Sequence, residues 1–535
     1  MRIDELWVEA FKNLRDLRVQ FDRESPYTVL VGENGSGKSN LLEALALIFR
    51  SLDLDEEAPF SYELKYQCRS HDVEVVAKEN RYPKFRTKPA GGGAYEALPR
   101  RKFMTADEDG RPLYRPTFVF GYYSGPGDRL ASIFEKHQER YYGAIIKEPS
   151  ARSVDSGDAS ALRRVFYAQT LHGQFALIAF FMEPEDSEDD REFLREFLQI
   201  DGLDCVLFAL NRPGWSRGGG DRRFWGAVGE VQEFLDRLYD EAMPPLRMDR
   251  RMSVDLASNR AVENLYLFLP GAEGLTRVYQ RYGNQYAFFT ALESMYLSKL
   301  LAEVRTRVRM APRAGGGEMT YRDLSEGEQQ LLLVLGLLKF TATEETLFLL
   351  DEPDTHLNPV WSTQYLSFLH RFIRQRETCH IVMSSHDPLV FAGLAREQVR
   401  VMRRGEEGQA IVEVPAKDPR GMGVAAILTS DLFRLRTTLD AETQERLDRK
   451  RILMQKGDLS DEDEKELESL HGKLERLGFS RSIRDPLYGL FLEAWTREED
   501  PVWRRQVQLT PEQQQDRKRL ASQIVERLRS EMASR

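Results

Sequence analysis

Cysteine is scarce in this chain, with three among 535 residues: Cys68, Cys205 and Cys379. No pair has the C-x-x-C spacing, so the sequence predicts neither a disulfide framework nor a zinc site. Long apolar runs are also missing, because the longest, around 175–182 and 331–338, fall well short of the roughly 20 residues that a membrane-spanning helix needs. The first residues do not form a signal peptide. We therefore expect reduced thiols in a cytoplasmic protein with no membrane partner.

Features of a nuclease are missing as well. The eight histidines are dispersed along the chain, whereas an HNH nuclease needs several of them together. The acidic cluster Asp461–Glu464 begins a charged helical segment, where negative charge complements the helix dipole. No heptad pattern is sustained long enough to predict coiled-coil arms. The sequence thus predicts no nuclease site in this chain, and any cutting of nucleic acid would fall to a separate subunit.

Charge and length set broader limits. A chain of 535 residues is too long to fold around one compact core, so two or three domains are expected. The net charge of −10 argues against a protein that coats DNA, but it permits a local basic surface. Basic clusters lie at 99–102, at 222–223 beside an aromatic pair, and at alternate positions of 305–309. Contact with nucleic acid and a solvated surface both remain open for these clusters.

A glycine-rich segment, residues 32–39, follows an apolar strand predicted at 27–31 and precedes a predicted helix. Strand, turn and helix start form the setting in which G-x-x-x-x-G-K-S binds phosphate. Glycine lets the backbone wrap closely, and N–H groups at the helix start face the anion. Lys38 is expected to reach the β- and γ-phosphates, and Ser39 to hold Mg²⁺. The residues expected to bind the nucleotide here are Asn34, Gly35, Ser36, Gly37, Lys38, Ser39 and Asn40.

Two adjacent carboxylates, Asp351 and Glu352, end a second apolar strand predicted from residue 346. Ligands bind at the carboxyl ends of strands in α/β sheets. Asp351 suits the Mg²⁺ shell, and Glu352 suits a general base that orients and deprotonates an attacking water.

The segment L-S-E-G-E-Q-Q, residues 324–330, precedes an almost wholly apolar predicted helix. Ser325 and Glu328 have the spacing of a capping box. A capped helix start with a nearby glycine is also an anion site, so both interpretations hold together. Ser325 lies 26 residues before Asp351 (351 − 325), which leaves room for one helix and a turn before the next strand.

The residues 324–330, followed by L-F-L-L-D-E-P-D-T-H-L-N-P, resemble the signature, Walker B and D-loop of ABC-type ATPases of the SMC, Rad50, RecF and OLD branch. The resemblance implies ATP and Mg²⁺ as cofactors, and two heads that sandwich two ATP molecules. It implies that Ser325 and Gly327 contact the γ-phosphate held by a second copy, with Asp354 at the seam between the copies. His386, after the strand predicted at 380–385, matches the histidine that senses the γ-phosphate.

Three further residues are assigned by the same resemblance. The family has a glutamine that completes the Mg²⁺ and water shell, and Gln169 is the candidate, with Gln174 as a rival. Lys12 and Asn13 occupy the turn at which related heads contact phosphate, although a solvated hairpin is the alternative there.

A closer resemblance rests on residues 120–126, 166–169, 172–175 and 423–433, which look like the ATPases of bacterial anti-phage systems. Septu-type PtuA proteins, including those attached to retrons, are the best match. In those systems the ATPase accompanies an HNH nuclease subunit. The resemblance therefore implies self-association into a dimer or higher oligomer, an HNH-type nuclease or toxin as effector, and retron components as further partners.

We therefore predict an α/β fold: an ABC-type ATPase head, a P-loop sheet flanked by helices, with an inserted α+β region and a C-terminal helical domain. The predicted function is a regulatory ATPase and scaffold of an anti-phage complex. The alternative is a RecF-like repair ATPase that clamps DNA when ATP binds. The predicted parts are 1–182 (N-terminal lobe of the head), 183–315 (insert), 316–415 (C-terminal lobe) and 416–535 (helical domain for assembly or partner docking).

Overall fold

The computed structural model describes residues 1–108, 110–145, 164–182, 188–216, 221–253, 259–282, 284–312, 315–341, 344–373, 376–456, 459–479, 491, 494–505 and 509–533. The chain forms two compact units. The first comprises Met1–Val390 and Glu397–Val414, and the second comprises Phe391–Arg396 and Pro415–Arg535. Among the described helices, none has the length and apolarity needed to cross a bilayer.

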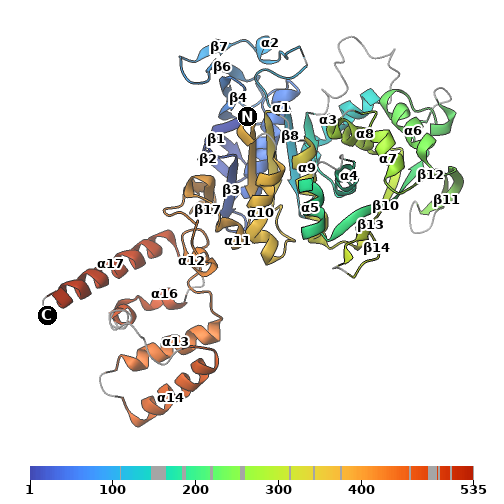
Figure 1. The fold of residues 1–535 in the computed structure, drawn as a ribbon. Helices are drawn as coiled ribbons and strands as arrows, with labels where there is room; N and C mark the ends of the chain where they lie inside the picture. The colour runs from blue at the N-terminus through green and yellow to red at the C-terminus, as the bar shows by residue number, and fades with distance from the viewer. Residues whose placement is uncertain are drawn as a thin grey trace. The chain divides into compact units, whose positions relative to one another are not determined.

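A seven-stranded sheet in the first unit is built from segments that lie far apart in the sequence (Figure 1). Its order is β18-β17-β3-β16-β15-β8-β9, and neighbours are parallel except for β17 and β18. Only β16 separates β3 from β15, so the loops after these three strands meet at one edge. The strands are β3 (Tyr27–Gly32), β8 (Phe118–Tyr123), β9 (Val165–Tyr167), β15 (Thr346–Asp351), β16 (Cys379–Ser384), β17 (Val399–Arg404) and β18 (Ala410–Glu413). The predicted α/β fold is confirmed.

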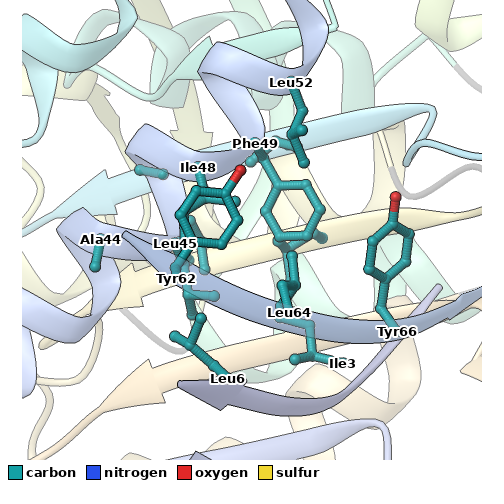
Figure 2. Close-up of a cluster of buried hydrophobic side chains, with 14 of the residues drawn as sticks. Ile3, Leu6, Ala44, Leu45, Ile48, Phe49, Leu52, Tyr62, Leu64 and Tyr66 are labelled. Atoms are coloured by element: carbon teal, nitrogen blue, oxygen red, sulfur yellow. The ribbon is translucent and has the colours of Figure 1, made fainter. Parts of the chain in front are cut away.

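A six-stranded antiparallel sheet, in the order β2-β1-β4-β5-β6-β7, packs against helix α1 (Lys38–Asp53). Figure 2 shows Leu45, Ile48 and Phe49 of α1 lying over apolar side chains of β1 and β4. All of them are buried, so this interface anchors the helix that follows the glycine-rich loop. The strands are β1 (Arg2–Phe11), β2 (Leu14–Gln20), β4 (Tyr62–Cys68), β5 (His71–Ala77), β6 (Lys84–Pro89) and β7 (Glu96–Leu98).

A five-stranded antiparallel sheet, in the order β11-β12-β10-β13-β14, belongs to the same unit. Its strands are β10 (Ile200–Asn211), β11 (Leu246–Ser253), β12 (Asn259–Pro270), β13 (Leu301–Met310) and β14 (Glu318–Thr320). Much of the predicted insert 183–315 thus shares one compact unit with the strands of the head, and the four-part division of the chain stays a prediction.

Helices fill the space around these sheets. At the contact between α4 and α9, a Cβ on Gly336 would lie 2.2 Å from the Cβ of Ala176, so glycine is required for this close approach. The helices of the first unit are α1, α2 (Arg100–Phe103), α3 (Ala131–Ile145), α4 (Leu171–Phe180), α5 (Glu188–Phe197), α6 (Gly229–Glu241), α7 (Glu273–Tyr279), α8 (Gln285–Leu297), α9 (Glu326–Thr341) and α10 (Pro359–Phe372).

The second unit is helical in its described part. The helices α13 (Ala441–Met454) and α14 (Asp461–Arg476) contact each other and bury Leu453, Leu470 and Leu474. Ser460 and Asp463 form a capping box at the start of α14. The remaining helices are α12 (Val424–Thr429), α16 (Pro501–Arg505) and α17 (Pro511–Ala533), while α11 (Pro388–Phe391) spans the sequence boundary between the units.

Candidate nucleotide-binding site

The glycine-rich loop joins β3 to α1 in a backbone conformation that residues with a side chain rarely adopt. Gly35 and Gly37 have φ angles of 78° and 108°, in the left-handed region that favours glycine. A Cβ on Gly32 would lie 2.0 Å from the carbonyl oxygen of Met402 in β17, so this glycine permits the close packing of the two strand ends. The buried Ser36 hydroxyl has no hydrogen-bond partner within the described residues. The loop therefore has the curvature and the spare polar group that a phosphate cradle needs.

Lys38 lies between the loop and two carboxylates. Its Nζ donates hydrogen bonds to the carbonyl oxygens of Gly32 (2.8 Å) and Glu33 (3.1 Å). Burial lowers the pKa of Lys38, and the charges of Glu352 and Asp351 oppose that shift. A mostly buried ammonium group with these neighbours suits an anionic ligand.

The turn between β1 and β2 supports the loop. Asn13 Nδ2 donates to the carbonyl oxygen of Gly35 (3.1 Å), and Asn40 Nδ2 donates to Asn13 Oδ1 (2.6 Å). Lys12, whose φ is 54°, forms an ion pair with Glu43 of α1. Asn13 and Asn40 therefore lie against the loop, while the ammonium group of Lys12 is directed to α1.

Asp351 ends β15 and faces the start of α1. Ser384 Oγ at the end of β16 donates to Asp351 Oδ1 (2.5 Å). Desolvation raises the pKa of Asp351, and hydrogen bonds from Ser384 and Ser39 oppose the shift. Ser39 and Asp351 are thus neighbours, with the hydroxyl and carboxylate oxygens that suit Mg²⁺. Among the described residues no group of three or more His, Cys, Asp or Glu side chains is arranged to hold a metal ion by itself, so such a site would rely on phosphate and water for its other ligands.

Glu352 has an unusual backbone, with φ at 53° for a residue that is not glycine. Its N–H donates to Ser384 Oγ (3.0 Å), and its Oε1 lies 3.2 Å from His386 Nε2. The hydrogen bond with His386 lowers the pKa of Glu352, against the opposing effect of burial. A carboxylate held ionised at the carboxyl end of the sheet suits the role of general base.

Ser325 caps α9. Ser325 Oγ accepts from the backbone N–H of Glu328 (3.3 Å), and Glu328 Oε2 accepts from the Ser325 N–H (2.7 Å). Ser325 is exposed, whereas a Cβ on Gly327 would lie 2.4 Å from the carbonyl oxygen of His356. The Ser325 hydroxyl also donates to Glu328 Oε2 (2.7 Å), so the capping interpretation holds within one chain.

Asp354 and Gln169 are each bonded within the chain. Ser385 Oγ donates to Asp354 Oδ2 (2.5 Å), and the Asp354 side chain is buried within the single chain. Gln169 follows β9, and its Oε1 accepts a hydrogen bond from the hydroxyl of Tyr296 in α8. Gln174, the other candidate for the glutamine of the Mg²⁺ and water shell, is buried, and its Oε1 accepts a hydrogen bond from Thr306 Oγ1 (3.3 Å).

Family models match two segments that each carry part of this site. Residues 1–86 match a model described as "AAA ATPase domain", and residues 221–392 match "AAA domain, putative AbiEii toxin, Type IV TA system". The Septu protein PtuA of Bacillus mycoides (strain KBAB4) is 26% identical over 197 residues, covering 35% of this chain and 27% of PtuA. The DNA replication and repair protein RecF of Synechococcus sp. (strain JA-2-3B'a(2-13)) is 48% identical over 81 residues, covering 15% of this chain and 17% of RecF.

The matched segments are thus similar to AAA ATPase domains, and shorter stretches are similar to PtuA and RecF. The chain spans only about a quarter of the length of PtuA and about a sixth of that of RecF. Among solved structures, the crystal structure of the SmcHead bound to the C-winged helix domain of ScpA aligns with 77% of this chain and 97% of that chain, at 13% identity and a TM-score of 0.32.

Sequence reasoning missed two residues whose side chains link separate segments of the candidate site. Gln330 Nε2 donates to the carbonyl oxygen of Glu352 (3.3 Å), and Gln330 Oε1 accepts from the N–H of His356 (3.1 Å). Arg129 donates to Asn40 Oδ1 (2.8 Å) and pairs with Glu43 (2.6 Å). The two glutamines that end the segment 324–330 could have indicated a role for Gln330, whereas no sequence pattern in the loop after β8 indicated one for Arg129.

Removing the amide of Gln330 should slow hydrolysis without weakening nucleotide binding. The two hydrogen bonds of Gln330 span the turn that holds Glu352, so Gln330→Met, of similar volume, should lower kcat about tenfold by loosening the base. Steady-state ATP hydrolysis and nucleotide titration would measure the two effects. Gln174→Met, which also removes a buried amide, should leave kcat near the wild-type value, and equal losses in both variants would point to general destabilisation.

Stability should depend on pH through Asp354. Burial raises the pKa of Asp354 to about 6, so the folded state binds this proton more tightly than the unfolded chain does. The contribution to stability is complete at low pH and is lost as pH rises through that value. Asp354→Asn is neutral at every pH. Its free energy of unfolding relative to wild type should therefore increase by about 1–2 kcal/mol as the pH rises from 5 to 8. Urea unfolding without nucleotide measures this, and a pH-independent difference would contradict it.

Proposed function

We propose that this chain binds ATP with Mg²⁺ and hydrolyses the ATP between two heads. Asn34–Asn40 would bind the phosphates, and Asp351 with Ser39 would hold the metal ion, with Gln169 completing its shell once released from Tyr296. Bound Mg²⁺ would neutralise charge on the transferring phosphoryl group. The observation that carries the proposal is the meeting of Lys38, Asp351 and the Glu352–His386 pair at the edge of one parallel sheet.

Glu352 would accept a proton at its carboxylate from the attacking water, and His386 would hold that carboxylate in place and respond to the γ-phosphate. Ser325 and Gly327 of a second copy would complete the pocket, with Asp354 supporting the turn near the seam. Lys12 and Asn13 would act from the turn beside the loop. Catalysis would then depend mainly on positioning and electrostatics, as phosphoryl transfer generally does.

The biological role that we propose is regulation of an anti-phage complex. The match to the Septu protein PtuA supports it. In this role the ATPase would hold a separate effector, an HNH-type nuclease or a toxin, in check until infection, with retron components as further partners. The helical second unit would serve assembly or effector docking. Co-expression with the product of a neighbouring gene tests this role, because a stable complex that releases or activates its effector on nucleotide turnover is the expected result.

A RecF-like repair function is the second candidate, since the RecF match reaches 48% identity over the segment that it covers. In that case the purified protein alone should bind DNA ends in an ATP-dependent and salt-sensitive way.

Mixing two inactive variants tests the shared pocket directly. Lys38→Ala removes the phosphate-binding ammonium, and Ser325→Arg fills the signature surface of the other copy. A mixed dimer then contains one pocket with both lesions and one with neither. We expect each variant alone to be inactive and the mixture to recover up to about a quarter of the wild-type rate, because random pairing gives half mixed dimers with one intact pocket of two. No recovery with intact folding would exclude a shared pocket.

A further inference from the structure

The five-stranded sheet of the first unit has two different faces. Side chains on one face, such as those of Phe208, Leu267 and Val308, are fully buried against the layer that contains α4, α6, α7 and α8 (Figure 1). On the other face the exposed side chains include Leu246 and Met248 of β11 and Phe268 of β12. This open face is therefore apolar and aromatic over part of its area, which a solvated sheet face ordinarily is not.

Arginines border the aromatic part of the open face. β13 presents Arg305, Arg307 and Arg309 at alternate positions, and all three are exposed. Glu303 Oε1 accepts from Arg305 Nε (3.0 Å), and Arg307 pairs with Glu318 of β14 (3.0 Å). The guanidinium groups are thus held in position while more than half of the Arg305 side chain stays accessible.

The strand register aligns these two kinds of side chain. Phe268 lies opposite Leu207, which in turn lies opposite Arg305, and residues directly opposite in antiparallel strands share a face. Adjacent strands are about 4.8 Å apart, so the aromatic ring and the guanidinium originate roughly 10 Å apart across the sheet. Tyr266 lies on the same face in the next row, opposite Ala209.

We propose that this open face binds single-stranded nucleic acid. Bases would stack on Phe268 and Tyr266, and phosphates would bind the row Arg305, Arg307 and Arg309. Alternate residues of an antiparallel strand are about 6.8 Å apart, so the row can contact successive phosphates of one extended strand. A five-stranded sheet is also too wide to enter a duplex groove, which admits at most a two-stranded ribbon.

Binding can be measured on the full chain by fluorescence anisotropy with a labelled 20-nucleotide single strand, without ATP, so that the result does not depend on the proposed ATPase function. Phe268→Ala should weaken binding about tenfold or more. Arg305→Gln combined with Arg307→Gln should also reduce the slope of log K against log salt by about 1.4, because each phosphate contact contributes about 0.7. Arg277→Gln, which removes an exposed, ion-paired arginine of α7, is the matched control and should bind like wild type.

Cys205 supplies a reporter on this face, since it lies opposite Arg307 and is partly exposed while Cys68 and Cys379 are buried. The oligonucleotide should slow alkylation of Cys205 by iodoacetamide, and the double arginine variant should lose that protection. Three results would overturn the proposal: no binding at 50 mM salt, tighter binding of duplex than of single strand, or binding without protection of Cys205. Self-association that Phe268→Ala abolishes, with no oligonucleotide bound, would identify a protein interface instead.

Discussion

Glu352→Gln should abolish most ATP hydrolysis while ATP binding is retained. The substitution keeps the shape of the side chain but removes the carboxylate that would accept a proton from water. A positioned general base contributes roughly 10²–10⁴-fold, so kcat should fall by about a thousandfold. ATP-bound head dimers should then accumulate, and light scattering coupled to size-exclusion chromatography should detect a doubled mass with ATP but not with ADP.

The matched control for this variant is Glu413→Gln in β18. Glu413 is an exposed carboxylate that pairs with Arg403, so its loss should change neither hydrolysis nor mass. If Glu352→Gln hydrolyses ATP at the wild-type rate, Glu352 is not the base, and the short contact with His386 would need another explanation.

Lys38→Ala should remove nucleotide binding itself. Lys38 is the buried cation of the loop, and its Nζ already lies beside two loop carbonyl oxygens with Glu352 and Asp351 nearby. Losing one partner of a buried charge pair costs roughly 2–5 kcal/mol, so affinity should fall by at least about thirtyfold. Titration with a fluorescent ATP analogue measures the loss.

Lys65→Ala is the control for that titration, because Lys65 pairs with Glu5 on β1 and should not affect the loop. Alanine favours helix, so the start of α1 should survive in Lys38→Ala. If Lys38→Ala keeps both its thermal stability and its nucleotide affinity, Lys38 is not part of the nucleotide-binding site.

The strands, loops and helix starts that sequence reasoning located correctly are those that depend on residues close together in the sequence. The loop before α1 and the strand before Asp351 follow from neighbouring residues alone: apolar runs, glycines at fixed offsets and a helix start. The placement of the motifs at the carboxyl ends of strands was also expected, whereas the order β3-β16-β15 of those strands was not predicted.

What sequence reasoning missed depends on contacts between distant segments. The ion pair of Lys12 with Glu43 and the hydrogen bond of Tyr296 with Gln169 join residues 31 and 127 positions apart, and no local pattern encodes either. The hydrogen bond to the buried Asp354 likewise comes from Ser385, 31 positions away and directly after β16. Side-chain partners of this kind become visible only when the elements are packed.

Gly327 affects how variants of the signature should be interpreted. A Cβ added to Gly327 would lie 2.4 Å from the carbonyl oxygen of His356 in the same chain, so even one added methyl group would force these two segments apart. A defect in Gly327→Ala would therefore combine an internal displacement with any lost contact to a second molecule. At the exposed Ser325 a larger side chain meets no such backbone clash, so a substitution there loses only the cap of α9 within the chain and is the cleaner probe of whatever docks against this surface.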